Sequence, residues 1–192
     1  ADVELSDSGR RQAERVAEWF RGVVPAAGIT EIWSSPLLRA RETAAVIAAA
    51  VDLPVTVEEG LSELNAGIFQ GHLWADLEAM FPEAVARWRS GDADYAIPGG
   101  ESRAQLAGRG RAALHALASR DAAAMIVVAH GGVLTAALGS MLGREHPLLA
   151  AAAERPFTKL PALANCSLTL LEWPGPRLLS FNETGHLAAR EP

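Results

Sequence analysis

The chain has 192 residues, a net charge of −6 and 49% hydrophobic residues, which is the composition of one globular domain with a sizeable core. The acidic balance argues against a nucleic-acid partner, and the single cysteine, Cys166, excludes an intrachain disulfide or a cysteine-based metal cluster. The sequence has no run of about 18 apolar residues and no signal-peptide layout at its start. We therefore expect a cytoplasmic protein without membrane contact.

The first third of the chain alternates between helix and strand patterns. Four apolar residues at the spacing i, i+3, i+4, i+7 predict an amphipathic helix that Ser6 caps: Ala13, Val16, Ala17 and Phe20. A short buried strand is expected over residues 28–34. Ser35-Pro36 then predicts the start of a second helix, with the proline at its first position, that continues to Ala50. Residues 55–57 read as a second strand.

The remaining elements are expected in chain order as follows: short helices over 74–81 and 83–90, separated by Pro82; a helix over 101–119; a buried strand over 124–129; a helix over 133–142; and closing strands over 166–172 and 177–181. This alternation predicts an α/β fold, a three-layer α/β/α sandwich with a mostly parallel central sheet. No internal repeat or linker is visible, so residues 1–192 are expected to form a single domain.

Two predicted strands end at residues suited to binding an anion. His130 lies where the strand over 124–129 ends, and Gly131 and Gly132 open the next helix, whose free N–H groups favour an anion. Arg39 lies about one turn beyond the end of an earlier strand, and arginine binds phosphate in a bidentate manner. For the isolated histidine motif, a histidine that only bonds locally in a tight turn is an equally good interpretation. Arg39 taken alone is better interpreted as a surface residue.

A carboxylate, Glu63, follows a strand and precedes a glycine-rich aromatic loop. Partial burial of this group would raise its pKa and suit it to general acid catalysis, although a solvated loop carboxylate is the simpler interpretation. Pro98-Gly99-Gly100-Glu101-Ser102 reads by itself as a turn and a helix cap. The histidines have no metal-ligand spacing, so we expect neither a metal site nor a cofactor.

Taken together and in order, these segments resemble the histidine phosphatase (phosphoglycerate-mutase-like) superfamily. The segments that carry the resemblance are ADVELSDSGRRQA at the start, SSPLLRARETA over 34–44, residues 61–71, PGGES over 98–102, VVAHGG over 127–132, and the tail over 181–187. Each motif is moderately specific, but their order and spacing span nearly the whole chain.

The resemblance implies a role for each matching residue. Arg39 corresponds to a phosphate-binding arginine, and His130 to the second active-site histidine, which contacts the phosphoryl oxygens with the backbone at Gly131. Glu63 corresponds to the acid that protonates the leaving oxygen and then activates water. The family's nucleophilic histidine, which forms a phosphohistidine, lies on a preceding central strand that ends in Leu-x-Arg-His-Gly. The chain starts after that motif, so we expect residues 1–192 alone to be inactive.

The resemblance leaves three functions open. The first is a metal-independent phosphatase acting on small phosphomonoesters of the sugar phosphate or phosphoglycerate type. The second is a phosphoglycerate mutase, which Leu64-Asn65-Ala66 disfavours, because the mutase branch usually has Arg-His-Tyr after the acidic residue. The third is a catalytically inactive phosphate-binding or interaction protein. The expected partners are a small phosphorylated metabolite, inorganic phosphate and, as one alternative, a second copy in a homodimer. Residues 72–98 are expected to form a substrate-pocket or lid segment.

Overall fold

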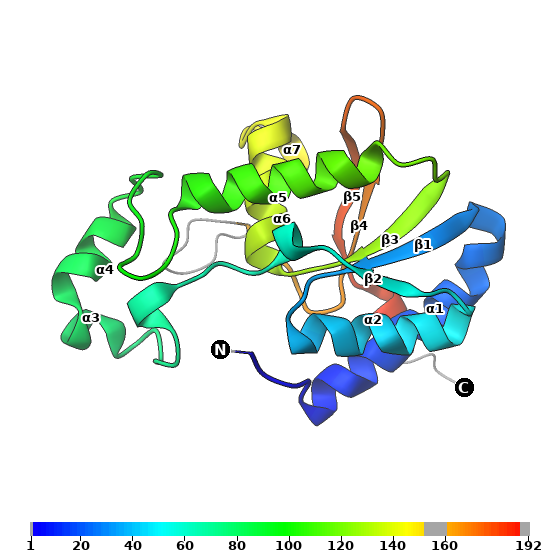
Figure 1. Ribbon diagram of the computed structural model, residues 1–192, viewed down its shortest axis with the longest axis horizontal. Coiled ribbons are helices and arrows are strands. Elements are labelled where there is room, and N and C mark those ends of the chain that lie inside the picture. Colours follow the sequence, from blue (N-terminus) through cyan, green and yellow to red (C-terminus); the bar gives the residue numbers. More distant parts are fainter. Residues whose placement is uncertain (1, 152–160, 189–192) are drawn as a thin grey trace.

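A parallel sheet of three strands lies at the centre of the computed structural model, which describes residues 2–151 and 161–188. The strands are β1 (Ile29–Ser34), β2 (Val55–Val57) and β3 (Ala124–Val128), in the order β2-β1-β3. Helices cover both faces of this sheet (Figure 1). Strands β4 (Leu168–Glu172) and β5 (Arg177–Glu183) pair antiparallel in a second, two-stranded sheet. The α/β/α architecture predicted from the sequence is confirmed.

The register of the parallel strands brings their carboxyl ends to one edge. Ser34, the last residue of β1, pairs with Val57 of β2 and with Val128 of β3. The chain leaves this edge at Ser35, whose backbone N–H donates to the carbonyl of Val128 at 2.9 Å. Residues that follow β1 and β3 are therefore neighbours in space although they are far apart in the sequence.

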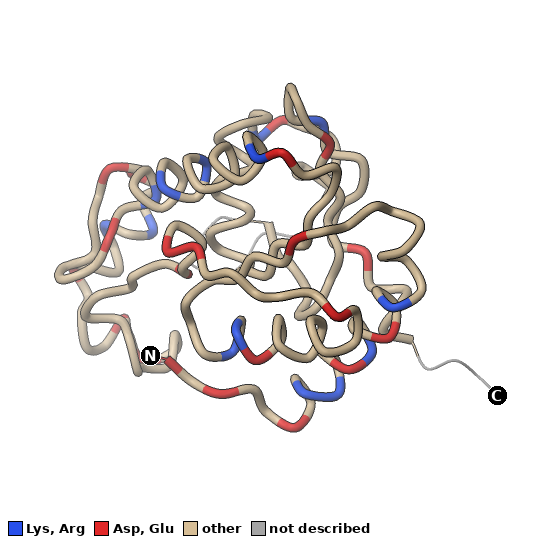
Figure 2. Tube along the Cα trace, turned by 45° about the vertical axis from the view of Figure 1, so that its right-hand side comes forward, with Lys and Arg blue, Asp and Glu red and all other residues tan. Residues whose placement is uncertain are grey.

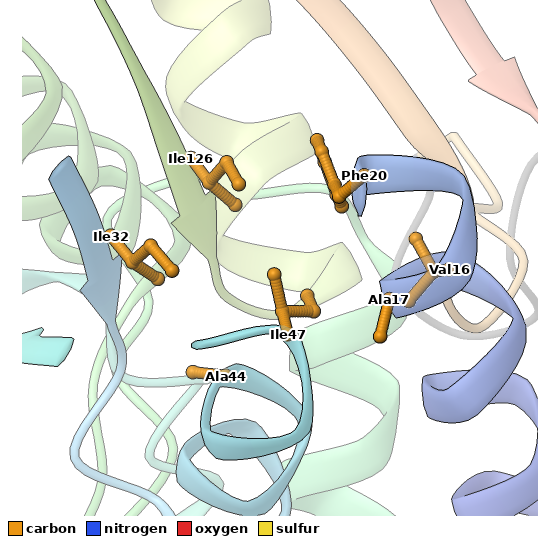
Figure 3. Close-up of a cluster of buried hydrophobic side chains, with 7 residues drawn as sticks. All are labelled: Val16, Ala17, Phe20, Ile32, Ala44, Ile47 and Ile126. Carbon is orange, nitrogen blue, oxygen red and sulfur yellow. The ribbon is translucent and has the colours of Figure 1, made fainter. Parts of the chain in front are cut away.

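One face of the sheet is covered by α1 (Asp7–Ala27) and α2 (Leu38–Val51). All four apolar residues predicted for the buried face of the first helix are buried, and the Ser6 hydroxyl caps that helix by accepting from the N–H of Gly9. Figure 3 shows how side chains from α1, α2, β1 and β3 point toward one another in a single apolar cluster: Val16, Ala17, Phe20, Ile32, Ala44, Ile47 and Ile126. Burial of this cluster fixes the first helical layer on the sheet.

The opposite face of the sheet is covered by α5 (Arg103–Ala118), against which α6 (Gly131–Leu142) packs. Side chains alternate between the two faces of a strand. Ile32 and Ile126 accordingly lie in the first cluster, whereas their neighbours Trp33, Met125 and Val127 pack with Leu61, Ala113 and Leu117 on the side of α5. The strand that precedes His130 thus has apolar contacts on both faces.

The segment between the sheet and α5 forms a separate group of short helices. These are η1 (Glu59–Leu61), η2 (Gly67–Phe69), α3 (Leu77–Met80) and α4 (Pro82–Arg89). Figure 1 shows α3 and α4 standing apart from the strands, at the left of the molecule. They are held by their own apolar cluster of Phe69, Leu77, Val85, Trp88 and Ile97. Near the C-terminal end of the chain lie α7 (Pro147–Ala150) and η3 (Gly185–Leu187).

Some element boundaries differ from those predicted. The second helix begins at Leu38 rather than at Pro36, because Leu37 is extended and donates its N–H to the Ser35 hydroxyl. Helix α3 covers Leu77–Met80 rather than 74–81. Helix α5 begins at Arg103, where Ser102 and Gln105 form a capping box. Within the described residues, no helix is long and apolar enough to cross a membrane.

Charged residues of both signs are interspersed along the outer helices and loops (Figure 2). Examples are the ion pairs of Arg21 with Glu18 on α1 and of Arg89 with Glu78 between α4 and α3. A mixed surface of this kind agrees with the overall charge of −6. An anion must therefore be recognised by local groups rather than by a broad basic face.

The contact between α5 and α6 generates a stability prediction. A methyl group at Gly110 would lie 2.7 Å from Val133 Cγ2 and 3.2 Å from Ala137 Cβ, whereas one at Gly108 would meet nothing within 4 Å. We expect Gly110→Ala to lower the free energy of unfolding by roughly 1–2 kcal/mol, because overpacking outweighs the gain in helix propensity. The matched variant Gly108→Ala should raise it by about 0.5–1 kcal/mol. Urea denaturation of both variants measures this, and shifts of the same sign would contradict the packing interpretation.

Candidate active site

His130 lies at the carboxyl end of β3 and is the N-cap residue of α6. Its imidazole is buried, with 8% of the residue exposed, and its Nε2 lies 2.8 Å from the hydroxyl of Ser35. Ser35 follows β1 and is fully buried. The hydrogen bond between these side chains therefore joins the ends of two adjacent parallel strands, at the edge where open α/β sheets bind ligands.

The surroundings of His130 keep its imidazole neutral. Burial and, to a smaller extent, the positive charges of Arg39 and Arg109 lower the pKa of His130 from its ordinary value of 6.5 to about 4, and Asp2 acts in the opposite direction. Both arginine side chains are therefore within electrostatic reach of the ring. A site in which positive charge opposes protonation of a histidine is electrostatically prepared for an anion.

Arg39 is the second residue of α2, four positions after Ser35. Asp2 lies beside it, because a carboxylate oxygen of Asp2 accepts from the N–H of Leu38 at 2.6 Å. Within residues 2–151 and 161–188, no carboxylate forms an ion pair with Arg39. The guanidinium thus has hydrogen-bonding capacity for a bound anion.

The carboxylate of Glu63 is bound at the N-terminus of α6. Its Oε2 accepts from the N–H of Gly132 at 2.9 Å, and its Oε1 accepts from the N–H groups of Val133 at 3.1 Å and Leu64 at 2.8 Å. A methyl group at Gly132 would overlap this carboxylate. Unpaired N–H groups at a helix N-terminus bind anions, and here a carboxylate takes that position. The contact places Glu63 next to His130 and Gly131.

The structure brings together the residues that the sequence singled out. His130 and Gly131 adjoin the Glu63 carboxylate through α6, and Arg39 lies within electrostatic reach of His130. The other histidines lie elsewhere. The His72 ring packs edge-on against Phe81, and His186 bonds to the carbonyl of Cys166. Over the part of the chain that the structure describes, no three His, Cys, Asp or Glu residues are close enough to hold a metal ion.

Three participants in the site were not identified from the sequence. Ser35 was used only to mark the start of a helix and within a matching segment, yet it bonds to His130. Asp2 was likewise included only within a matching segment. Arg109 lies on α5, 21 residues before His130, and has no local motif of its own. The strand-end position of Ser35 was the one available signal, because neighbouring parallel strands end at the same edge.

Comparisons with known proteins agree with this arrangement. The family model "Histidine phosphatase superfamily (branch 1)" matches residues 1–184. The chain is 39% identical to "Phosphoglycerate mutase-like protein 4" of Arabidopsis thaliana over 136 residues, which cover 69% of this chain and 58% of that protein. It is 34% identical to "Glucosyl-3-phosphoglycerate phosphatase" of Mycolicibacterium vanbaalenii over 150 residues, or 74% of this chain and 64% of that protein. The chain thus spans about three-fifths of the length of these two relatives.

A solved structure extends the likeness to the fold. The mycobacterial glucosyl-3-phosphoglycerate phosphatase in complex with inorganic phosphate superposes with a TM-score of 0.75 at 29% sequence identity. The alignment covers 97% of this chain and 91% of the mycobacterial chain. The overlap includes all the described elements that position His130, Glu63 and Arg39.

The lowered pKa of His130 predicts a pH-dependent stability. Between about pH 6.5 and about pH 4 the unfolded chain binds a proton at this residue and the folded chain does not, so stability falls as the pH is lowered through this range. The substitution His130→Gln removes the titrating group and should flatten this part of the curve. Urea unfolding of both proteins from pH 7 to pH 4 tests it. Parallel curves for the two proteins would show that His130 is not buried in its neutral form.

Proposed function

We propose that this chain, which belongs to the histidine phosphatase superfamily, provides most of the active site of a phosphatase for small phosphomonoesters, acting through a phosphohistidine intermediate. The observation that carries the proposal is the meeting of Arg39, His130 and the N-terminus of α6 at one end of the sheet, with the Glu63 carboxylate bound there. Sugar phosphates and phosphoglycerate-type compounds are the substrate class that the relatives suggest.

The phosphoryl group would be bound by hydrogen-bond donors at the carboxyl end of the sheet. Arg39 offers a planar, permanently charged donor, and Gly131 offers backbone N–H at the helix start. Burial and the nearby arginines oppose protonation of the His130 imidazole. A phosphate dianion would offset that positive charge and favour the protonated ring, which then donates to a phosphoryl oxygen. Such donors stabilise the charge on a transferring phosphoryl group.

Glu63 would move protons between the leaving group and water. In the first step the nucleophilic histidine bonds to phosphorus, the phosphorus–oxygen bond of the ester breaks, and Glu63 gives its proton to the departing oxygen. In the second step water attacks phosphorus, Glu63 takes a proton from that water, and the phosphorus–nitrogen bond breaks, which frees the histidine and releases inorganic phosphate. One carboxyl group beside the phosphoryl position serves both steps, as general acid and then as general base.

The nucleophile would come from a strand that pairs with the free edge of β3. Within the described residues, β3 has a ladder with β1 on one side, β4 has a ladder with β5 on one side, and no ladder joins β3 to β4. Leu168 of β4 nevertheless packs against the cluster that contains Ile126 of β3. We propose that a strand ending in Arg-His-Gly, as the resemblance implies, lies between β3 and β4 and brings its histidine to the same sheet edge as His130.

Substrate choice would be made by residues 72–98. Leu64, which follows Glu63, packs both against the cluster of the α3–α4 segment and against the cluster that holds α5 to α6. The loop that carries the acid is thus also the connection to this segment. Leu73, Trp74 and Met80 are exposed on the segment and offer apolar surface that a substrate could contact. A cytoplasmic location, a metal-independent reaction and a homodimer stay predictions from the sequence.

Phosphoglycerate mutase is the second candidate, because several relatives have mutase or mutase-like names. The sequence Leu64-Asn65-Ala66 after the acid disfavours it. A mutase returns the phosphoryl group to a second hydroxyl of its substrate, whereas a phosphatase releases it to water. Release of inorganic phosphate from phosphoglycerate without isomerisation would distinguish the two activities.

The proposal predicts that activity depends on the additional strand. A form extended at its N-terminus by an Arg-His-Gly strand should hydrolyse nitrophenyl phosphate in the presence of EDTA, and residues 1–192 alone should not, because loss of a nucleophile costs several orders of magnitude in rate. The intact mass of each folded sample identifies which form is assayed. Full turnover by residues 1–192 would place the nucleophile within this chain. Loss of activity in EDTA that zinc or magnesium restores would contradict the metal-independent reaction.

The role of Glu63 predicts a dependence on the leaving group. In the form extended by the Arg-His-Gly strand, called the active form below, Glu63→Gln should lower kcat about 10²–10⁴-fold for an alkyl or sugar phosphate. The reason is that general acid–base assistance is lost. The loss should be much smaller for nitrophenyl phosphate, whose leaving group needs little protonation. Inhibition by inorganic phosphate should be retained and become no weaker, because Glu63 is not one of the proposed phosphate-binding groups, and this serves as the control for an intact anion site. Equal losses for both substrates would mean that Glu63 shapes the pocket and transfers no proton.

A further inference from the structure

We propose that Arg109 and Glu101 are positioning residues for the acid–base chemistry. They hold residues 60–65 so that the Glu63 carboxylate stays at the N-terminus of α6. This inference rests on the proposed function where it concerns rates, and on the geometry alone where it concerns the placement of Glu63. Neither residue was identified as functional from the sequence.

The guanidinium of Arg109 uses every donor it has. Its Nε and one terminal nitrogen donate to the Glu101 carboxylate at 3.2 and 2.6 Å. The remaining bonds go to the backbone of the loop: to the carbonyls of Gly60 at 3.0 Å, Ser62 at 2.7 Å and Glu63 at 3.3 Å. A guanidinium has five N–H donors, and five hydrogen bonds are made. One rigid side chain thus binds three carbonyl groups on the segment that leads to Glu63.

Glu101 holds the other side of the same loop. Its Oε1 accepts from the N–H of Asn65 at 2.8 Å, and its own N–H donates to the Asn65 carbonyl at 2.9 Å. The backbone is therefore fixed at residues 60, 62 and 63 by Arg109 and at residue 65 by Glu101. Glu63 lies between these fixed positions, and its carboxylate accepts hydrogen bonds from the N-terminus of α6.

This arrangement compensates for the lack of regular structure. Residues 62–66, between η1 and η2, belong to no helix or strand. Carbonyl groups that are partly shielded from water need hydrogen-bond partners, and Arg109 supplies them at residues 60, 62 and 63. The positive charge of Arg109 also lowers the pKa of His130, so the guanidinium lies within electrostatic reach of the phosphoryl site. The anchor and the reacting groups therefore form one connected structure.

A purely structural ion pair would behave differently from a positioning pair. The Arg109 and Glu101 side chains are 28% and 14% exposed, so the pair is partly shielded from water. If the pair served stability alone, its loss would slow all substrates equally or not at all. If it positions Glu63, its loss should weaken only the steps in which Glu63 transfers a proton.

The kinetic test uses the active form with Arg109→Met, Arg109→Lys and Glu101→Gln. Arg111→Met on the same helix, at an exposed position, is the matched control. We expect Arg109→Met to lower kcat at least about tenfold for an alkyl phosphate, a fraction of the full acid–base contribution, and to change nitrophenyl phosphate hydrolysis little. In a Glu63→Gln background it should cause no further loss. Lysine should restore little, since three donors on one nitrogen cannot span the carboxylate and three carbonyls.

A second measurement uses residues 1–192 and needs no activity. Hydrogen exchange at the amides of Leu64, Gly132 and Val133, which bond to the Glu63 carboxylate, should accelerate in Arg109→Met and Glu101→Gln and stay unchanged in Arg111→Met. Unchanged exchange at these amides in both pair variants would overturn the positioning role, as would equal kinetic losses for both substrates. Accelerated exchange in the pair variants, together with no phosphatase activity in the form extended by the Arg-His-Gly strand, would overturn the proposed function. The positioning role would then still be supported.

Discussion

The contact between the Glu63 carboxylate and the N-terminus of α6 connects the parts of this molecule that matter for chemistry. One side of the contact is the helix that follows β3 and begins next to His130, and the other is a loop without regular structure. The N–H groups at a helix start have no partners within the helix. A carboxylate there accepts hydrogen bonds from them, and its negative charge is stabilised by the positive end of the helix dipole. The sheet fixes His130, and this contact fixes the acid relative to it.

The same contact sets a constraint on ligand binding. A phosphoryl group is attracted to the helix N-terminus for the same reason as the carboxylate, and two anions in adjacent positions repel each other. Under the proposed function, a phosphate monoester would bind beside Glu63 only if Arg39 and the other donors outweigh this repulsion.

Local patterns in the sequence predicted the elements well and the site in part. The buried face of α1 and the strand end before His130 follow from apolar periodicity and from a run of apolar residues. The predicted start of α2 at Pro36 was wrong. The Ser35 hydroxyl accepts from the N–H of Leu37, and the chain stays extended past Pro36. Arg109 could not be found in this way. Its partners at residues 60–63 are about 47 positions away and are carbonyl groups, which every residue has, so no side-chain pattern marks them.

The electrostatics explain how an acidic protein can be built to hold an anion. The chain carries a net charge of −6, yet Arg39 and Arg109 both act on His130, and burial favours the uncharged form of that imidazole. A third positive charge beside the two arginines would cost free energy, whereas a neutral ring costs little. Under the proposed function, a bound phosphate would offset the positive charge of the arginines. A few donors close to the ligand can bind an anion without a broad basic surface. The outer helices can therefore carry charges of both signs.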